Sequence, residues 1–212
     1  MIGLRNLDLR SHQRPVMALA SAVLLLCALV LRQPLEASMA WHMLVQIPMI
    51  LIAGALAALA QSKIAAQCDN QDGKSGVWLQ HLRRYDEQGV PSLLLLVFLL
   101  TYWMIPRSID TAVASPFADA LKFVSLFAGG MLLVDSLTRA NLVIQVFFLG
   151  NVSWMMSIIG VMYQDDSTRL CNFYLVDDQI VAGQGLVVLA VLIPALWLWW
   201  RLYVRGGWRH LL

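Results

Sequence analysis

The chain has 212 residues, of which 59% are hydrophobic and only 13% are charged, whereas about a quarter of the residues in an ordinary soluble domain are charged. This composition excludes a soluble globular protein and predicts an integral membrane protein. The formal net charge is +2. The basic residues are explained by membrane topology, so we expect no nucleic-acid partner.

Six stretches are long and apolar enough to form membrane-spanning helices, since a bilayer core needs about 20 apolar residues. The predicted spans are 16–31, 39–60, 91–106, 118–138, 141–162 and 180–203. The loop at 61–90 is too short for a second domain, although residues 75–85 within it are typical of an amphipathic helix. The predicted fold is therefore all-α, a single polytopic membrane bundle of about six transmembrane helices that takes up residues 1–212.

The distribution of lysine and arginine predicts the orientation, because cytoplasmic loops carry the excess. With the N-terminus inside, eleven basic residues fall in inner segments and only Arg32, Arg107 and Arg169 in outer ones, while Lys122 lies within a span. Both termini are therefore predicted to be cytoplasmic. An alternative interpretation treats the first apolar run as a signal peptide that is cleaved near residues 38–40, which would leave the orientation of the later spans unchanged.

Residues 39–49, with the sequence MAWHMLVQIPM, combine a histidine at a membrane boundary with three methionines. On a helix, a recurring spacing of three or four residues places one set on a shared face. That set is Met39, His42 or Met43, Gln46 and Met49. Imidazole and thioether groups suit copper, and thioethers favour the cuprous ion. The alternative is structural, because methionine commonly fills gaps in apolar helices and an interfacial histidine usually serves as a hydrogen-bonding group.

Other polar or small residues within the spans indicate packing contacts. Asp119 and Lys122 are spaced i, i+3 at the start of the fourth span, which predicts a local ion pair near the outer boundary. Residues 128–130, with the sequence AGG, suit close helix packing. The three cysteines lie far apart along the chain, at 27, 68 and 171, so no disulfide framework or CxxC metal pair is predicted.

Three places in the chain together resemble the CtaG-like family of cytochrome c oxidase assembly factors, bacterial membrane proteins associated with copper delivery. Residues 42–46, HMLVQ, match the first half of the family's His-Met-x-x-His pattern. Residues 103–130 are similar to its Pro-turn-helix segment. Residues 178–183, DQIVAG, match its Asp-Gln-x-x-Ala-Gly signature, which is the most specific of the three.

The chain also departs from the family pattern. Gln46 stands where the family often has its second histidine, and Asp119 and Phe123 stand where further histidines are expected. Family members commonly have seven spans, and this chain is predicted to have about six. The resemblance implies that the protein lies in the bacterial inner membrane and has the fold of the CtaG-like family. The missing histidines do not affect this expectation about the fold, but they do affect the expected metal site.

The resemblance implies an accessory protein that holds copper transiently and passes it to a membrane partner such as a terminal oxidase by ligand exchange. The candidate metal ligands, on the periplasmic side, are His42, Met39, Met43, Asp119 and Asp178. One alternative is a metal-free structural subunit of a respiratory or other membrane complex. A small transporter is a further alternative, although the chain has no inverted repeat with paired broken helices.

Catalysis and haem binding are not expected. The chain has no glycine-rich phosphate loop, no HExxH motif and no Ser/His/Asp grouping on one side of the membrane. Ligation of a haem by two intramembrane histidines is not expected either, because His12, His81 and His210 belong to predicted inner segments.

Overall fold

The computed structural model describes residues 3–61, 86–165, 171 and 173–203, with side chains from Pro15 onward. All regular secondary structure in these ranges is helical, which confirms the predicted all-α class. The helices are α1 (Gly3–Val30), α2 (Arg32–Glu36), α3 (Met39–Trp41), the π-helix η1 (His42–Gln46), α4 (Ile47–Gln61), α7 (Val90–Met104), α8 (Pro106–Ala114), α9 (Pro116–Arg139), α10 (Leu142–Asp165) and α11 (Val176–Tyr203). The predicted amphipathic helix at 75–85 lies outside the described residues.

Four stretches of the described chain are long and apolar enough to cross a bilayer, and a fifth is formed if α7 and α8 count as one bent span. The four are Met39–Gln61, α9, α10 and α11. The predicted count of about six is not reached, because the apolar part of α1, Pro15–Val30, is a shorter helix. At 1.5 Å per residue it is about 24 Å long, compared with about 30 Å for a bilayer core.

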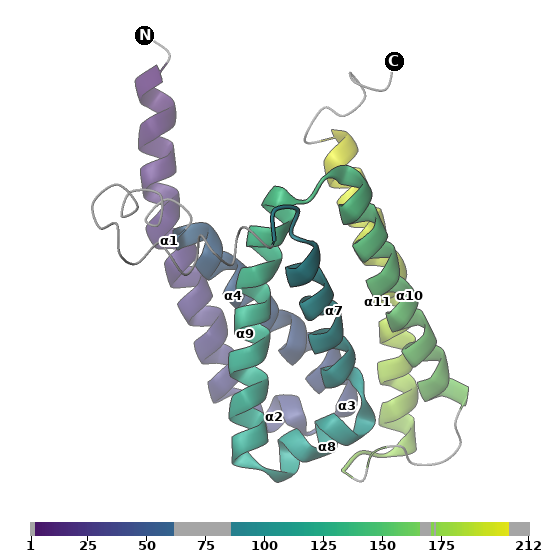
Figure 1. Cartoon of the computed structure of the whole chain (residues 1–212). Helices are drawn as coiled ribbons and strands as arrows, with labels where there is room; N and C mark the ends of the chain where they lie inside the picture. The colour runs from purple at the N-terminus through teal and green to yellow at the C-terminus, as the bar shows by residue number, and fades with distance from the viewer. Residues whose placement is uncertain (1–2, 62–85, 166–170, 172, 204–212) are drawn as a thin grey trace.

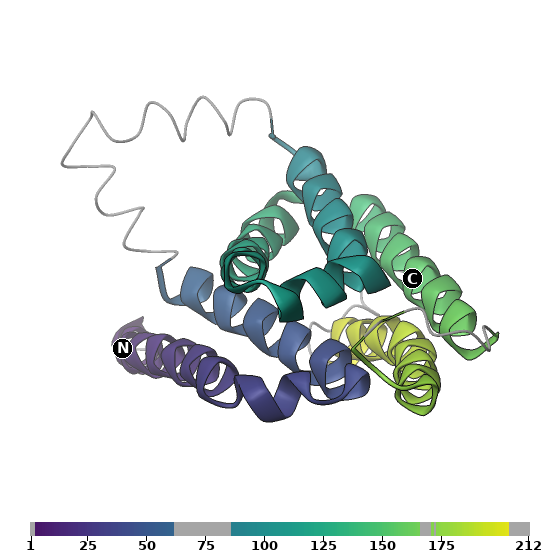
Figure 2. The same cartoon turned by 90° about the horizontal axis from the view of Figure 1, so that it is seen from below.

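The segment after α7 lies between the predicted spans 91–106 and 118–138, which leave residues 107–117 as a connection. It forms the helix α8, which meets α7 at 72°. Pro106 and Pro116 stand in the first turns of α8 and α9, where a missing N–H costs nothing. The residues before them, Ile105 and Ser115, are extended, as a following proline requires. The chain therefore bends before each of the two prolines, at the start and at the end of α8. Helix α8 lies across the end of the bundle (Figure 2).

Glycine contacts hold the two densest helix pairs together. A Cβ atom at Gly54 of α4 would clash with the carbonyl oxygen of Phe127, and one at Gly130 of α9 would clash with that of Leu51. This contact confirms the prediction of close packing at residues 128–130. Gly160 of α10 and Gly183 of α11 approach each other in the same way. A Cβ atom at Gly160 would lie only 2.7 Å from the Gly183 carbonyl oxygen.

The helices form two groups (Figure 1). Helices α1, α4, α9 and α7 pack side by side, and the α10–α11 hairpin joins them through α7, α3 and η1. The start of α1 and the end of α11 lie at one end of the bundle, and α2, α3 and α8 lie at the other. The predicted candidate residues at 39–43, 119 and 178 all lie near this second end, since each belongs to the part of its helix that starts there.

Candidate functional site

The side chain of Lys122 is fully buried in α9 and is surrounded by acceptors from three elements. Its Nζ donates hydrogen bonds to Glu36 Oε1 at 2.8 Å, to Gln46 Oε1 at 3.0 Å and to His42 Nε2 at 3.2 Å. It also forms an ion pair with Asp119 Oδ1 at 2.9 Å, which confirms the predicted i, i+3 pair. An ammonium group has three donors, so every donor of Lys122 has an acceptor.

Arg32 supplies a second cation to the same cluster. Its Nε lies 3.1 Å from Glu36 Oε2, and its Nη1 lies 3.0 Å from Asp119 Oδ2. Each carboxylate is thus shared between Arg32 and Lys122, one oxygen to each cation. The two positive and two negative groups balance, which lowers the cost of keeping them out of water. We refer to Arg32, Glu36, His42, Gln46, Asp119, Lys122 and Tyr174 as the charge network.

Burial and the neighbouring cations have opposite effects on the pKa of Glu36. This residue lies outside the membrane-spanning stretch, which begins at Met39. Burial by itself would raise the pKa of the Glu36 carboxyl group. Lys122 outweighs burial through its hydrogen bond and its positive charge, with a further hydrogen bond from Arg32, so this pKa lies below its ordinary value. Glu36 is therefore an anion at neutral pH and a permanent partner for both cations.

His42 is fully buried, and both of its ring nitrogens are engaged. Because the Lys122 ammonium can only donate, His42 Nε2 must accept, and the ring proton lies on Nδ1. Nδ1 then donates to Tyr174 Oη at 2.9 Å, and the Tyr174 hydroxyl donates to the backbone carbonyl oxygen of Glu36 at 3.0 Å. These hydrogen bonds fix His42 as a neutral imidazole in one tautomer.

His42 and Gln46, which both contact Lys122, are the first and last residues of the π-helix η1. The backbone N–H of Ile47 bonds to the carbonyl oxygen of His42, five residues earlier, in place of the usual α-helical partner. Pro48 follows directly and has no N–H to give to Leu44, so this turn cannot be a regular α-helix. π-Turns often occur at functional sites. The prediction of one shared helical face did not anticipate this turn.

Met39 and Met43 are buried in a second cluster, which is made of hydrophobic side chains. Its sulfur-bearing members are Met39, Met43, Met104, Met156 and Cys171. All of these are at most 6% exposed. We call this set the sulfur cluster. It is assembled from four separate parts of the chain, namely the start of the second predicted span, the end of α7, α10 and the segment before α11.

Cys171 is held as a thiol by its surroundings. Its Sγ donates to the carbonyl oxygen of Pro106 at 3.7 Å. Burial, and then the nearby carboxylate of Asp110, raise the pKa of Cys171 to about 12. The thiol is therefore uncharged at neutral pH and is a weak nucleophile there.

Asp178 lies in the first turn of α11, outside both clusters. Its Oδ1 accepts a hydrogen bond from Ser38 Oγ at 3.1 Å. A carboxylate at this position is favoured by the helix dipole, and the hydrogen bond joins α11 to the start of α3. The five predicted ligands thus occupy three settings: His42 and Asp119 in the charge network, Met39 and Met43 in the sulfur cluster, and Asp178 at Ser38.

The donor sets of the two clusters differ in how they suit a copper ion. The charge network does not fit one, because the Lys122 ammonium lies among the carboxylate, amide and imidazole acceptors that a cation would need, and like charges repel. The sulfur cluster differs in donor type, because thioether and thiol groups are soft and suit a cuprous ion better than a hard cation.

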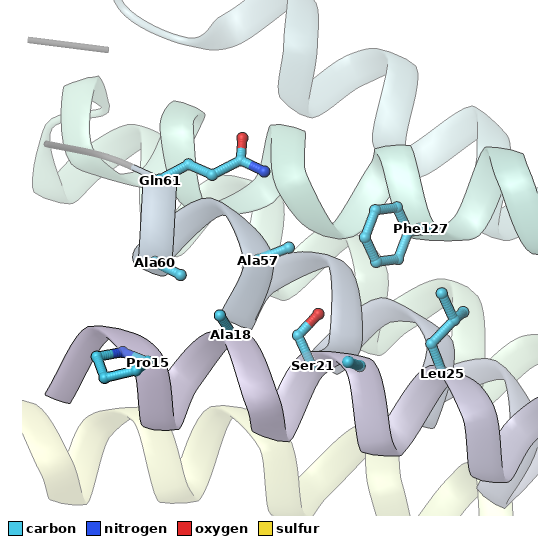
Figure 3. Close-up of a pocket in the computed structure, with 9 residues that line it drawn as sticks. Pro15, Ala18, Ser21, Leu25, Ala57, Ala60, Gln61 and Phe127 are labelled. Carbon is cyan, nitrogen blue, oxygen red and sulfur yellow. The ribbon is translucent and has the colours of Figure 1, made fainter. Parts of the chain in front are cut away.

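A pocket of about 500 Å³ lies between α1, α4 and α9, away from both clusters (Figure 3). Alanines at positions 18, 22, 57 and 60 form most of its wall, with Leu25 and Phe127. The hydroxyl of Ser21 is used within the fold, since it donates to the carbonyl oxygen of Ala53 at 2.7 Å. The lining contains no charged side chain, and the amide of Gln61 is its other polar side chain. The pocket therefore offers mainly apolar volume.

Comparison with known proteins gave no match among family models, curated proteins or solved structures.

Proposed function

We propose that this chain is an accessory protein for the assembly of a copper-containing terminal oxidase in the bacterial inner membrane, with both termini in the cytoplasm, and that cuprous copper is its cargo. The observation that carries the proposal is the sulfur cluster, in which four methionines and Cys171 from distant parts of the chain are buried together. The resemblance to CtaG-like proteins supplies the biological context. No bond-making catalysis is required.

The charge network has a different role in this proposal. It ties Arg32 and Glu36 of α2 to α9 and, through Tyr174, to the segment before α11. The sulfur cluster draws residues from beside these same segments. The network therefore holds in place the elements that carry the sulfur donors, and its lysine excludes a cation from the imidazole side.

Thioether ligands are neutral, so they bind a cuprous ion without first losing a proton, and they release it readily to a site with more anionic donors. Cys171, in contrast, must lose its proton in order to ligate. Its raised pKa makes copper binding through this thiol dependent on pH. Transfer to the oxidase is by ligand exchange at the end of the bundle where α3 and α8 lie.

The test is the copper content of the purified full-length protein in detergent, loaded with cuprous ion under reductant and measured by mass spectrometry. Met43→Leu/Met104→Leu is the decisive variant, because leucine nearly keeps the volume of methionine and removes only the thioether. His42→Gln is the matched comparison. Near-stoichiometric copper that falls at least tenfold in the methionine variant and is retained in His42→Gln would support the sulfur site.

The second candidate function is a metal-free structural subunit, and the Lys122 ammonium favours it, because it is bound to His42 and Asp119, two of the five predicted ligands. The same experiment decides between the two. If the parent protein retains no copper, the carrier proposal is wrong and the structural role stands. If copper is lost in His42→Gln but kept in the methionine variant, the ion binds at the charge network and our division of the site is wrong.

A further inference from the structure

Helix α10 presents two polar side chains to the lipid near the middle of its span. Asn151 and Trp154 are both exposed, Trp154 to 69%. The midpoint of Leu142–Asp165 lies between Ser153 and Trp154, so Asn151 lies within about 4 Å of the middle of this membrane-spanning helix at 1.5 Å per residue. Within the described residues neither side chain has a hydrogen-bond partner.

Both residues are unusual at that depth. A bilayer core has no water to satisfy an amide, and tryptophan normally lies at the membrane interface with its indole N–H in the headgroup layer. Several other polar side chains along α10 are engaged. Gln145 donates to the carbonyl oxygens of Leu137 and Ala140, and the Ser157 hydroxyl donates to that of Ser153. Asn151 and Trp154 differ from Gln145 and Ser157 in this respect, although all four belong to the same helix.

The surface around them is open and apolar. Phe147 and Ile158 continue the exposed face on either side, at 62% and 45% exposure. A Cβ atom built on Gly150 would meet nothing within 4 Å, so a second helix can approach the backbone closely beside Asn151. Only 11% of the most apolar window of α10 is buried, the lowest fraction among the four spanning stretches.

We propose that this face, formed by Phe147, Gly150, Asn151, Trp154 and Ile158, is the contact surface of a homodimer. Two copies inserted in the same direction can be related by a two-fold axis along the membrane normal, so their α10 helices run parallel and each residue near the axis faces its own copy. An amide is both a donor and an acceptor. Asn151 therefore complements Asn151 of a second copy, as a buried asparagine does in a parallel coiled coil.

The experiment measures association of the full-length chain in liposomes by Förster transfer between donor- and acceptor-labelled copies over a range of protein-to-lipid ratios. The wild type is expected to dimerise, and Asn151→Leu to weaken dimerisation about tenfold or more, as for loss of an interhelical hydrogen bond in a membrane. Asn151→Gln, which keeps an amide, is expected to retain most of the association.

Asn141→Leu is the matched control. It makes the same chemical change at the residue directly before the same helix, at a side chain whose Oδ1 already accepts from the backbone N–H of Ile144 at 2.9 Å. It is expected to leave dimerisation unchanged. Folding is followed separately by thermal unfolding, and Asn151→Leu is expected to be no less stable than wild type because it puts an apolar side chain against lipid.

Three outcomes would overturn the proposal: a wild type that is monomeric at every ratio, an Asn151→Leu variant that associates as the wild type does, or equal weakening by Asn141→Leu. A monomeric wild type that instead captures a different membrane protein through Asn151 would assign the face to that partner and not to a second copy.

Discussion

The replacement of Lys122 by methionine tests whether the charge network is a structural unit. Methionine has a similar volume and keeps the apolar stem, but it removes the ammonium group. Glu36 and Asp119, whose side chains are 9% and 6% exposed, then share the single cation of Arg32. The buried cluster acquires a net charge of −1, and the acceptors of Gln46 and His42 lose their donor.

The magnitude follows from the burial of these groups. Removing one partner of a buried ion pair costs about 3–5 kcal/mol. Arg32 still contacts both carboxylates, and its side chain is 37% exposed, so we expect the lower end, about 3 kcal/mol. For a chain of this size, 1 kcal/mol corresponds to a change of about 2–4 °C in Tm. Lys122→Met is therefore expected to lower Tm by about 6–12 °C, measured by tryptophan fluorescence in mild detergent at neutral pH.

The double variant Lys122→Met/Glu36→Gln is the control, because it returns the cluster to zero net charge with Arg32 and Asp119 as the remaining pair. It is expected to be more stable than Lys122→Met alone, although the second substitution also removes a native partner of Arg32. A Tm for Lys122→Met within about 2 °C of the wild-type value, or two losses that simply add in the double variant, would refute the reasoning, since additivity means that the two groups are not coupled.

Three further predictions concern acidity, thiol reactivity and packing. The pKa of Glu36 is lowered in the folded state. The stabilisation that the Glu36 carboxylate provides is therefore complete above the unfolded-state pKa and is lost as the pH falls through the lower folded-state pKa. Between pH 5 and pH 3, Tm should accordingly fall less steeply in Glu36→Gln than in wild type. With its pKa raised to about 12, Cys171 should be about one part in ten thousand thiolate at pH 8. It should therefore react with iodoacetamide only after unfolding, as peptide mass spectrometry can detect, and modification of Cys171 in the folded protein at the rate of a free thiol would contradict its burial. Gly54→Ala should lower Tm by several degrees or prevent folding, because the added methyl group meets the Phe127 carbonyl oxygen across the α4–α9 contact; Gly150→Ala, where nothing lies within 4 Å, is the matched substitution that should have little effect on monomer stability.

Hydrophobic length and local spacing were sufficient to predict the helical class, the positions of the later helices and two contacts. The predicted spans 118–138 and 141–162 correspond to α9 and α10 within a few residues, and both the Asp119–Lys122 pair and the close packing at Gly130 are present. These features depend on residues close together in sequence or on backbone contacts that only small residues permit. The bend at Pro106 and the helix α8 were missed, because a nine-residue amphipathic segment with two flanking prolines is also typical of a turn.

The composition of the charge network could not be predicted from spacing, because members that are hydrogen-bonded to each other are up to 138 residues apart. Glu36 and Arg32 lie in a segment that has the sequence of a short polar turn, and Tyr174 lies in a loop. One sequence signal was present: a lysine within an apolar span needs partners in the protein, since a charge facing lipid is costly. That requirement predicts acceptors near Lys122 but cannot identify them, because it does not specify which turn folds back onto the helix.

The contacts of Lys122 also explain the residue types at positions 46 and 119. Gln46 and Asp119 stand at positions where the resemblance implies imidazoles, and in this chain both are acceptors for the Lys122 ammonium. A cuprous ion and an ammonium group each carry one positive charge, but only the ammonium brings its own donors, for which amide and carboxylate oxygens are better partners than imidazole groups. Neutral His42 fits either cation through Nε2. A set of acceptors arranged around an internal ammonium group therefore accounts for the amide at position 46 and the carboxylate at position 119 in this chain.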